Sequence, residues 1–403
     1  MFDFLKKKVG SRLGLDIGTS TLKMVEISQE ADGRHLKNYA FLDLFLSSQA
    51  KALARCEATD IMSEQSLVSL IKGFLKKGDF SSREVVVSVP VFSSFFTVIS
   101  LPAMSESELE SAIRYEAKKY VPLPLDEFEL DWSISSSQSA ISESGATGEL
   151  KSGKRLEVLL VAVPREIVQR LSRIVAGLGL KLSAMEAENF SLVRALQNQI
   201  NQLTQELKTK IVVAKQDVHR IKTNCLVLDA GARSSNLIWL QDNLVRLVHF
   251  IDYSGNRVTN FLAEKTHSGF GEIEEIKRTR KLVGVRVGSD LIRNTNEDEA
   301  VIQNGLDQLK PVFGKVVSEI KAVVDSAQAG TIVKGQSLDP PHFCLLSGGS
   351  VNLTVFQDYL KQNLDIPVFM ANPFIGLSVP QGAEDYLSDL GPSMSVAVGL
   401  AMR

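Results

Sequence analysis

Short apolar runs separated by turn residues dominate the opening of the chain and predict strands. Apolar residues cluster over residues 13–17, 21–28 and 36–45, and small hydroxyl residues fill the turn between the first two runs. This pattern is typical of an antiparallel meander. The spacing changes over residues 63–77, where apolar residues recur on one face of a helix and Ser63 is suited to cap it. Strands followed by a helix predict one half of an α/β domain.

An uncharged segment, residues 85–105, has the length of a membrane-spanning helix. Two prolines, six serine or threonine residues and many β-branched residues argue against a helix there. We therefore expect two strands, over residues 85–90 and 95–102, with the junction at residues 90–94.

Regular spacing of apolar residues continues through the rest of the chain, with the helix period in some segments and the strand period in others. Pro311 is expected to bend or interrupt the start of a long helix. Two polar segments, residues 133–154 and 208–222, are expected to be surface connections. Further helices are expected over residues 105–121, 165–176, 189–207, 271–282, 307–329 and 392–403, and another from about residue 256. Further strands are expected over residues 156–164 and 181–188 and within residues 342–347 and 365–374, and a strand-turn-strand unit is expected over residues 225–240.

The composition is that of an ordinary globular protein, with 44% hydrophobic and 23% charged residues among 403. This length predicts two or three domains. A net charge of −2 lacks the basic excess of nucleic-acid binders, so we expect no nucleic-acid partner. Cys225 and Cys344 lie singly within apolar runs, which predicts buried thiols in a reducing compartment. The opening MFDFLKKK is not a signal peptide, so we expect a cytoplasmic protein.

The turn after the first strand has the chemistry of a phosphate site. Asp16 precedes Ile-Gly-Thr-Ser-Thr, and later in the chain Asp229 precedes Ala-Gly-Ala-Arg-Ser-Ser, again between two apolar runs. Gly18 permits close approach of a ligand to the backbone, and the surrounding N–H groups and hydroxyls can bind an anion. A carboxylate does not favourably face a phosphate, so Asp16 and Asp229 are candidates for Mg²⁺, which takes one or two carboxylates and keeps several waters. Either turn alone is as consistent with an ordinary hairpin, and the repetition favours a site.

A Gly-Gly-Ser turn follows an apolar strand near the end of the chain. Gly348 and Gly349 would place the N-terminus of the next helix beside a ligand, where the helix dipole favours an anion or a sugar hydroxyl. These three segments, in this order, resemble the phosphate 1, phosphate 2 and adenosine motifs of the ATPase superfamily that contains actin, sugar kinases and DnaK-type chaperones.

Within that superfamily the chain is similar to the PilM family of type IV pilus assembly proteins, which is related to the cell-division protein FtsA. The most specific match is IRYEAKKYVPLPLDE, residues 113–127, which belongs to a subdomain that PilM and FtsA insert and that actins lack. Other matches are the opening LGLDIGTSTLKMVEIS, the central VLLVAVPREIV and MEAENFSLVRAL, and the terminal ANPFIGLS and VAVGLAMR. Together they cover nearly the full chain.

The resemblance implies an α/β, actin-like (ribonuclease H-like) two-domain ATPase fold with an inserted subdomain of the FtsA/PilM type. The first domain would comprise residues 1–82 and 184–224, the second part including a crossing helix, and the inserted α/β subdomain would span residues 83–183. The second domain would comprise residues 225–403, with a small helical subdomain at residues 256–338.

The same resemblance implies that ATP or ADP binds with Mg²⁺ in the cleft between the two domains. The metal would lie near Asp16 and Asp229, and Glu188 or Glu186 would polarise the attacking water as the general base. The residues assigned to nucleotide binding are Gly18, Thr19, Ser20, Thr21 and Lys23 at the terminal phosphates, Gly231, Arg233, Ser234 and Ser235 opposite them, and Gly255, Glu274, Lys277, Gly348, Gly349 and Ser350 toward the adenosine.

Several of these residues have a purely structural alternative. Lys23 can pair with a carboxylate that only stabilises the fold. Glu274 and Lys277 are spaced to form an ordinary pair on a helix surface. Glu186 and Glu188 can simply hydrogen-bond the crossing helix.

Two departures from the family bear on catalysis. Arg233 stands where PilM relatives usually have glycine, and Glu186 replaces a more usual aspartate. Arg233 either reaches the terminal phosphate or fills the pocket and weakens nucleotide binding. Efficient hydrolysis is therefore not expected, and the enzymatic prediction is limited to weak ATPase activity.

The leading functional hypothesis is a cytoplasmic ATP-binding platform of the pilus machinery. The resemblance implies that it binds the cytoplasmic tail of a PilN-like inner-membrane protein in a groove between the first subdomain and the inserted one, by strand addition or pocket insertion. It would reach the membrane only through that partner, and nucleotide would regulate the contact. Self-association into a filament is left open. The alternatives are an FtsA-like division protein and a small-molecule kinase, although no sugar-binding motif is found.

Overall fold

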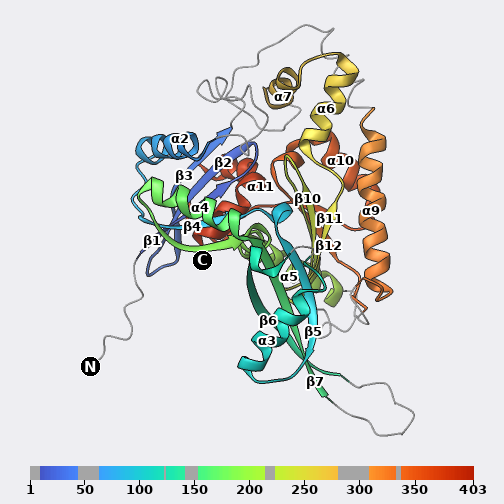
Figure 1. Ribbon diagram of the computed structural model, residues 1–403. Helices are drawn as coiled ribbons and strands as arrows, with labels where there is room; N and C mark the ends of the chain where they lie inside the picture. The colour runs from blue at the N-terminus through green and yellow to red at the C-terminus, as the bar shows by residue number, and fades with distance from the viewer. Residues whose placement is uncertain are drawn as a thin grey trace, which may run out of the picture.

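The described residues form three β-sheets, two with five strands and one with three (Figure 1). The computed structural model describes residues 10–43, 63–121, 124–140, 153–213, 223–279, 308–332 and 337–403. Our predictions for the first eight residues, the centre of the loop at 133–154, most of the connection at 208–222 and the end of the helix at 271–282 lie outside the described residues.

The first sheet is built from the predicted opening meander. β1 pairs antiparallel with β2 and β2 with β3, while β4 lies parallel to β1 and β8 parallel to β4. The strands are β1 (Ser11–Ile17), β2 (Thr21–Gln29), β3 (Arg34–Asp43), β4 (Glu84–Val89) and β8 (Lys181–Ala187). Helices α2 (Glu64–Lys77), capped by Ser63 as predicted, and α4 (Arg165–Leu178) share a core with this sheet.

The second sheet repeats the pairing of the first. Its own meander, β9 (Asn224–Ala230), β10 (Ser235–Gln241) and β11 (Leu244–Ile251), is antiparallel, and β12 (Phe343–Ser347) and β13 (Val368–Met370) continue it in parallel. Its helices are α6 (Gly255–Thr266), α7 (Phe270–Thr279), α9 (Lys310–Gln328) and α10 (Thr354–Asn363). The repeated sequence motif therefore corresponds to a repeated sheet topology.

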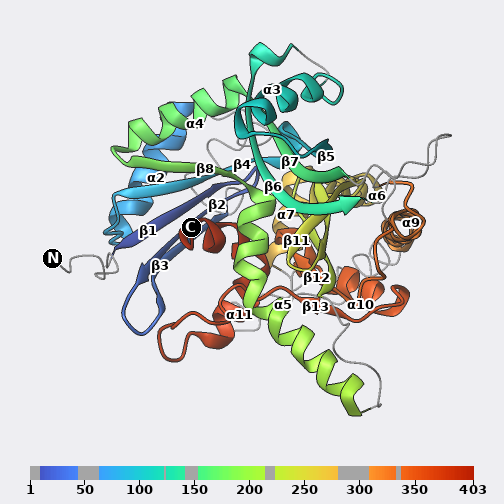
Figure 2. The same ribbon diagram turned by 90° about the horizontal axis from the view of Figure 1, so that it is seen from below.

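Two helices cross between the large sheets and join them (Figure 2). They are α5 (Glu188–Val213) and α11 (Glu384–Ala401). One buried cluster combines Val86 of the first sheet and Val227 of the second with residues of both helices. Gly399 permits this close crossing, because a Cβ atom there would lie 1.8 Å from the carbonyl oxygen of Ser191.

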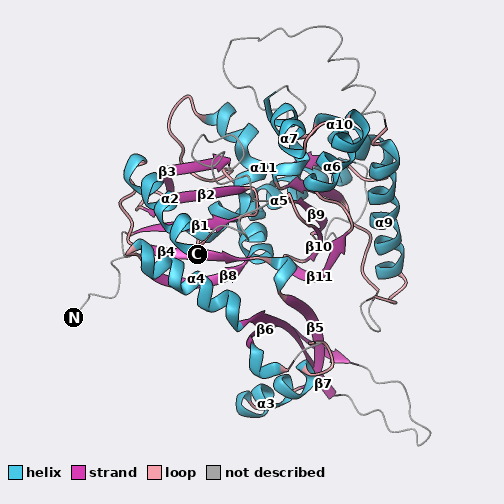
Figure 3. Ribbon diagram, turned by 45° about the horizontal axis from the view of Figure 1, so that its top comes forward, coloured by secondary structure: helices cyan, strands magenta, loops and turns pink. Residues whose placement is uncertain are grey.

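The third sheet lies beside the two domains and carries helix α3 (Glu106–Ala117) (Figure 3). Its strand order is β5-β7-β6, with all pairs antiparallel. The strands are β5 (Phe95–Pro102), β6 (Phe128–Ala140) and β7 (Gly153–Pro164). Its own small core contains Ile99, Ile113 and Val158. We call this unit, from β5 to β7, the inserted sheet.

The uncharged segment at 85–105 forms two strands as predicted, but they belong to different sheets. Pro90 and the 3₁₀ turn η1 (Val91–Ser93) follow β4, and the chain then leaves the first sheet. Proline lacks the N–H group that would continue a ladder, so the break falls where the strand pairing ends. β4 thus lies in the first sheet rather than in the insert, where we had placed it. Among the described residues, no helix is long and apolar enough to cross a membrane.

Several element boundaries also differ from the predictions. Pro311 lies in the first turn of α9, where its missing N–H is tolerated, so it starts the helix instead of bending it. β6 and β7 extend into the polar segment at 133–154. Antiparallel pairing gives their backbone N–H and C=O groups hydrogen-bond partners whatever the side chains are. α5 continues to Val213, and α11 begins before its internal Pro392. Cys225 and Cys344 are buried free thiols, as predicted.

Candidate functional site

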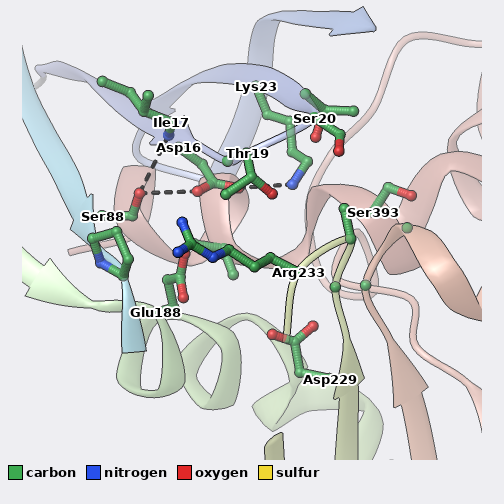
Figure 4. Close-up of a pocket in the computed structure, with 18 of the residues that line it drawn as sticks. Asp16, Ile17, Thr19, Ser20, Lys23, Ser88, Glu188, Asp229, Arg233 and Ser393 are labelled. Carbon is green, nitrogen blue, oxygen red and sulfur yellow. Dashed lines mark hydrogen bonds and ion pairs between the residues drawn. The ribbon is translucent and has the colours of Figure 1, made fainter. Parts of the chain in front are cut away.

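A pocket of about 420 Å³ lies between the two large sheets, where the ends of their central strands meet. It is lined by the β1–β2 turn, the β9–β10 turn and the turn after β12, which are the three segments that the sequence singled out. Figure 4 shows side chains from both domains pointing into this space. Tertiary structure therefore brings the three motifs together.

The β1–β2 turn forms one wall of the pocket through Gly18, Thr19, Ser20 and Thr21. The Gly18 N–H donates to the carbonyl oxygen of Thr21 at 3.0 Å and closes the turn. A Cβ atom on Gly18 would lie 3.0 Å from that same oxygen, so the turn is tight as well as open to the pocket. This geometry leaves hydroxyl groups at the rim, where they suit an anionic ligand.

Asp16 and Lys23 face each other at the base of this turn. The Lys23 ammonium donates to Asp16 Oδ2 at 2.8 Å, and the Ser88 hydroxyl donates to Asp16 Oδ1 at 2.9 Å. Burial acts to lower the pKa of Lys23, but the Asp16 carboxylate outweighs it and the pKa of Lys23 is raised. Lys23 thus pairs with a carboxylate, as its structural alternative predicts. It also lines the pocket.

The β9–β10 turn forms the opposite wall. The Gly231 N–H donates to the carbonyl oxygen of Ser234 at 2.9 Å, which reproduces the hydrogen bond of the first turn. Asp229 points into the pocket from the end of β9 (Figure 4). Burial raises the pKa of Asp229 to about 6, with Asp16 adding to the rise and Lys23 opposing it. The Arg233 guanidinium lies over the Phe92 ring, 4.7 Å from its centroid.

The turn after β12 joins the second wall through backbone contacts. Gly348 has a φ of +90°, and a Cβ atom there would lie 2.3 Å from the Ala230 carbonyl oxygen, so only glycine fits. The Ser350 hydroxyl donates to the Gly231 carbonyl oxygen at 2.8 Å, and the Gly255 N–H donates to the same oxygen at 3.0 Å. Gly349 also lines the pocket.

The helix expected directly after this turn is displaced. A short 3₁₀ turn, η4 (Gly349–Asn352), follows Gly348, and α10 begins only at Thr354. The helix that begins beside Gly348 and Gly349 is therefore a single 3₁₀ turn, and the α-helix follows it. Leu353, which directly precedes α10, is buried in the core of the second domain.

Glu274 and Lys277 form a buried pair, with 2% and 8% of each residue exposed. The Lys277 ammonium donates to Glu274 Oε2 at 2.8 Å, to the Thr259 hydroxyl at 2.7 Å and to the Gly255 carbonyl oxygen at 3.1 Å. Their position in the pocket wall excludes the alternative of a solvated surface pair. Burial of a charge requires such partners, and here they also order Gly255.

Glu188, at the start of α5, lies on the pocket floor beneath Arg233 (Figure 4). Its Oε2 accepts a hydrogen bond from the Val91 N–H at 3.1 Å. Burial, helped by the charges of Asp16 and Asp229, raises the pKa of Glu188 to about 8. Burial therefore makes Glu188 hold its proton more tightly than an ordinary glutamate does.

Two residues assigned from the sequence lie outside the pocket lining. Ser235 is fully buried at the start of β10. Glu186 forms an ion pair with Arg194, which also donates to the Gly399 carbonyl oxygen at 2.9 Å. Glu186 thus supports the crossing of α5 and α11, as its structural alternative held.

Some pocket residues were missed by the sequence reasoning. Ser88 is the main one, because it positions Asp16 and also accepts from the Ile17 N–H at 3.4 Å. Its signal was a lone hydroxyl within the apolar run VVVSVP. Phe92 gave no signal, since an aromatic residue beside a strand is usually part of a core. Other residues that line the pocket are Asn236, Asn352, Tyr386 and Ser393.

The donor set fits a nucleotide with a divalent cation. Three carboxyl groups, from Asp16, Asp229 and Glu188, face one pocket together with Lys23. Mg²⁺ prefers such oxygen ligands and holds them partly through water. The paired turns, with glycines that a Cβ atom would crowd, let phosphate oxygens approach backbone N–H groups. When bound, the cation would supply charge neutralisation at the terminal phosphate.

Comparisons with known proteins identify the family and the fold. The family described as "Type IV pilus assembly protein PilM" matches residues 14–284. The chain is similar to a solved structure described as "PilM-PilN type IV pilus biogenesis complex", with a TM-score of 0.69 and 23% identity over 97% of this chain and 98% of that one. This likeness confirms the predicted fold, including the insert.

Two further solved structures are similar at lower scores. The ethanolamine utilization protein EutJ from Carboxydothermus hydrogenoformans has a TM-score of 0.48 and 13% identity, over 97% of this chain and 89% of that one. MreB5 of Spiroplasma citri bound to AMPPNP has a TM-score of 0.41 and 11% identity, over 97% of this chain and 94% of that one.

Proposed function

The chain belongs to the PilM family of type IV pilus assembly proteins and has their actin-like fold, and from this we propose that it is an ATP-binding platform of the pilus machinery. The observation that supports nucleotide binding, the nucleotide half of this proposal, is that two matching phosphate-sized turns and three carboxyl groups meet in one interdomain pocket. The raised pKa of the buried Glu188, the candidate general base, favours regulatory or weak hydrolysis over rapid turnover.

Asp16 and Asp229 would hold Mg²⁺, and the Ser88 hydroxyl fixes the orientation of Asp16. Lys23 and the hydroxyls of the first turn bind the terminal phosphates. Glu188 would be the residue that accepts a proton from the attacking water, and a cation in the pocket would favour the ionised form that this role needs.

The proposed partner is the cytoplasmic tail of a PilN-like inner-membrane protein, supported by the structural likeness to a PilM-PilN complex. The inserted sheet has two edge strands, β6 and β5, and β5 also contacts β11 of the second domain. An added strand would pair with the edge backbone groups that these contacts leave open. We place the protein in the cytoplasm, recruited to the inner membrane by this tail. Self-association stays a prediction. No described residue provides an observation that favours the division-filament or kinase alternatives.

The first prediction concerns Asp229→Asn measured by isothermal titration calorimetry. In the presence of Mg²⁺, the affinity for ATP should fall by about tenfold, or roughly 1.4 kcal/mol, because a cation ligand is lost. With EDTA, ATP should bind the variant no more weakly than wild type, since a negative charge near the phosphates has been removed. The matched control is Asp252→Asn in the same domain, whose carboxylate is 66% exposed and pairs with Arg257.

Absence of ATP binding at millimolar concentration, with or without Mg²⁺, would refute the nucleotide half of the proposal. The partner half is tested separately with a synthetic peptide of the PilN-like tail from the same organism. Peptide binding without any ATP binding would leave a pilus platform that does not use nucleotide.

A further inference from the structure

We propose that Arg233 and Glu188 form a latch on the segment that leads into the inserted sheet, and that ATP with Mg²⁺ opens it. The segment is residues 90–94, between β4 and β5. This inference rests on the proposed nucleotide binding and adds the route by which the pocket acts on the inserted sheet. It also gives Arg233 a role that neither sequence alternative contained.

The latch segment is a compact turn that can move as a unit. The Ser93 and Ser94 hydroxyls both donate to the Pro90 carbonyl oxygen, at 3.0 and 2.9 Å. The Ser94 N–H donates to the Val91 carbonyl oxygen at 3.0 Å. The segment is the direct covalent link from the first sheet, through β4, to the inserted sheet, through β5. Its position therefore affects where β5 lies.

Two pocket residues hold this turn from different elements. Glu188, at the start of α5, accepts the Val91 N–H at 3.1 Å. Arg233 comes from the phosphate turn of the second domain and covers the ring of Phe92, which is still 40% exposed. Figure 4 shows Arg233 extending across the pocket toward Ser88, with Glu188 below it. The cation–π contact thus spans the cleft between the domains.

A bound nucleotide competes for both residues. A phosphate beside Gly231 and Ser234 offers the Arg233 guanidinium charged, paired oxygen acceptors, which bind it more strongly than an exposed aromatic ring does. A divalent cation near Asp16 and Asp229 would attract the carboxyl oxygens of Glu188, which line the same pocket, and so compete with the Val91 N–H for them. Each ligand component removes one contact from the turn, and both together release it.

Release of the turn connects the pocket to the partner surface. β5 is an edge strand of the inserted sheet, and the proposed tail adds to an edge of that sheet. A nucleotide that frees residues 90–94 therefore changes the mobility of an edge without any direct contact between nucleotide and tail. Such coupling is a shift between latched and released populations.

Hydrogen exchange of the full-length protein, read by mass spectrometry or NMR, tests the latch. The Val91 amide is a direct reporter, because its protection depends on Glu188. With Mg²⁺ and a non-hydrolysable ATP analogue, amides of residues 91–94 should exchange about fivefold faster or more. Without nucleotide, Arg233→Ala should raise the exchange rates of the same amides toward those of the nucleotide-bound protein. Phe92→Leu, which keeps an apolar side chain, should have the same effect.

The matched control is Arg257→Ala, an exposed arginine of the same domain that pairs with Asp252. It should leave exchange at residues 91–94 unchanged. If calorimetry shows that the analogue binds while exchange at these amides stays at the apo rate, the latch is wrong and the proposed function stands. If the analogue does not bind, the proposed nucleotide function and the latch fall together. Unchanged exchange in Arg233→Ala also overturns the latch.

Discussion

Asp16 illustrates how single residues shape the pocket. Its carboxylate accepts from Lys23 on one oxygen and from Ser88 on the other, and 3% of its side chain is exposed. A buried charge is costly unless it is paired and hydrogen-bonded, and here both conditions are met. The three residues lie on neighbouring strands β1, β2 and β4, so the pairing of the sheet creates the arrangement.

The second prediction concerns the pH dependence of stability through Glu188. Its pKa is about 8 in the folded protein against an ordinary 4.5, so the native state holds a proton that the unfolded chain releases. The contribution of Glu188 to the free energy of unfolding should therefore be fully present below pH 4.5 and be lost as the pH rises toward 8. Asp229, raised to about 6, adds to the loss with the same sign.

Thermal unfolding of the apo protein between pH 5 and 8 measures this effect. Glu188→Gln removes the titrating group and should flatten the decline. Glu110→Gln, at an exposed position on α3 that pairs with Arg114, is the control and should keep the wild-type slope. A Glu188→Gln slope equal to that of wild type would contradict the prediction.

At the scale of elements, the crossing of α11 over its neighbours depends on small residues. A Cβ atom on Gly399 would lie 1.8 Å from the Ser191 carbonyl oxygen of α5, and one on Gly14 of β1 would lie 2.2 Å from the Ala397 carbonyl oxygen. Because these contacts are to backbone atoms, an added methyl group can be accommodated only if whole elements move. The crossing in turn sets the position of the turn after β12, since the Gly348 N–H donates to the Pro392 carbonyl oxygen at 2.8 Å.

The third prediction compares two glycines that both lie within helices. Gly399→Ala should lower the free energy of unfolding by about 3 kcal/mol, because it overpacks the contact between α11 and α5. Gly73→Ala in α2 should raise it by roughly 0.5–1 kcal/mol, since alanine restricts the unfolded chain. A Cβ atom on Gly73 meets nothing within 4 Å among the described residues.

Urea unfolding of the two variants and wild type under one condition is the measurement. Equal effects of the two substitutions would show that helix propensity, and not the close crossing, determines the outcome.

At the scale of the whole molecule, the inserted sheet is held against the second domain by a buried ion pair. Arg246 of β11 donates to Glu157 of β7 at 2.5 Å, with 13% and 5% of the side chains exposed. β5 contacts β11 along the same boundary, beside a cavity of about 530 Å³ lined by both strands. The inserted sheet therefore touches both domains, through the latch segment and through this pair.

The fourth prediction is that Arg246→Met lowers the free energy of unfolding by about 3 kcal/mol, because it leaves the Glu157 charge buried without its counterion. The double variant Glu157→Gln with Arg246→Met should recover most of that loss. The control is Arg173→Met, which breaks a pair with Glu64 whose arginine side chain is 56% exposed and should change stability by less than about 1 kcal/mol. A double variant no more stable than Arg246→Met alone would count against the ion-pair explanation.

Much of this architecture was predictable because local patterns carry it. The period of apolar residues predicted the meanders and helices, and the repeated Asp-x-Gly turns predicted two related halves with a shared pocket. The turn residues Gly18, Gly231 and Gly348 show the reason. Tight turns with close backbone contacts require glycine, and that requirement is visible in sequence.

Other properties depended on which distant segments meet. The sequence could not show that β4 and β5, on either side of the turn that begins at Pro90, belong to different sheets, because both strands have the same apolar pattern. It gave Glu186 and Glu188 the same candidate role, whereas Glu186, near the end of β8, pairs with Arg194 and Glu188, at the start of α5, faces the pocket. The contact of Arg233 with Phe92 joins residues of two domains. Local chemistry determined the turns, and packing across the cleft decided what each side chain faces.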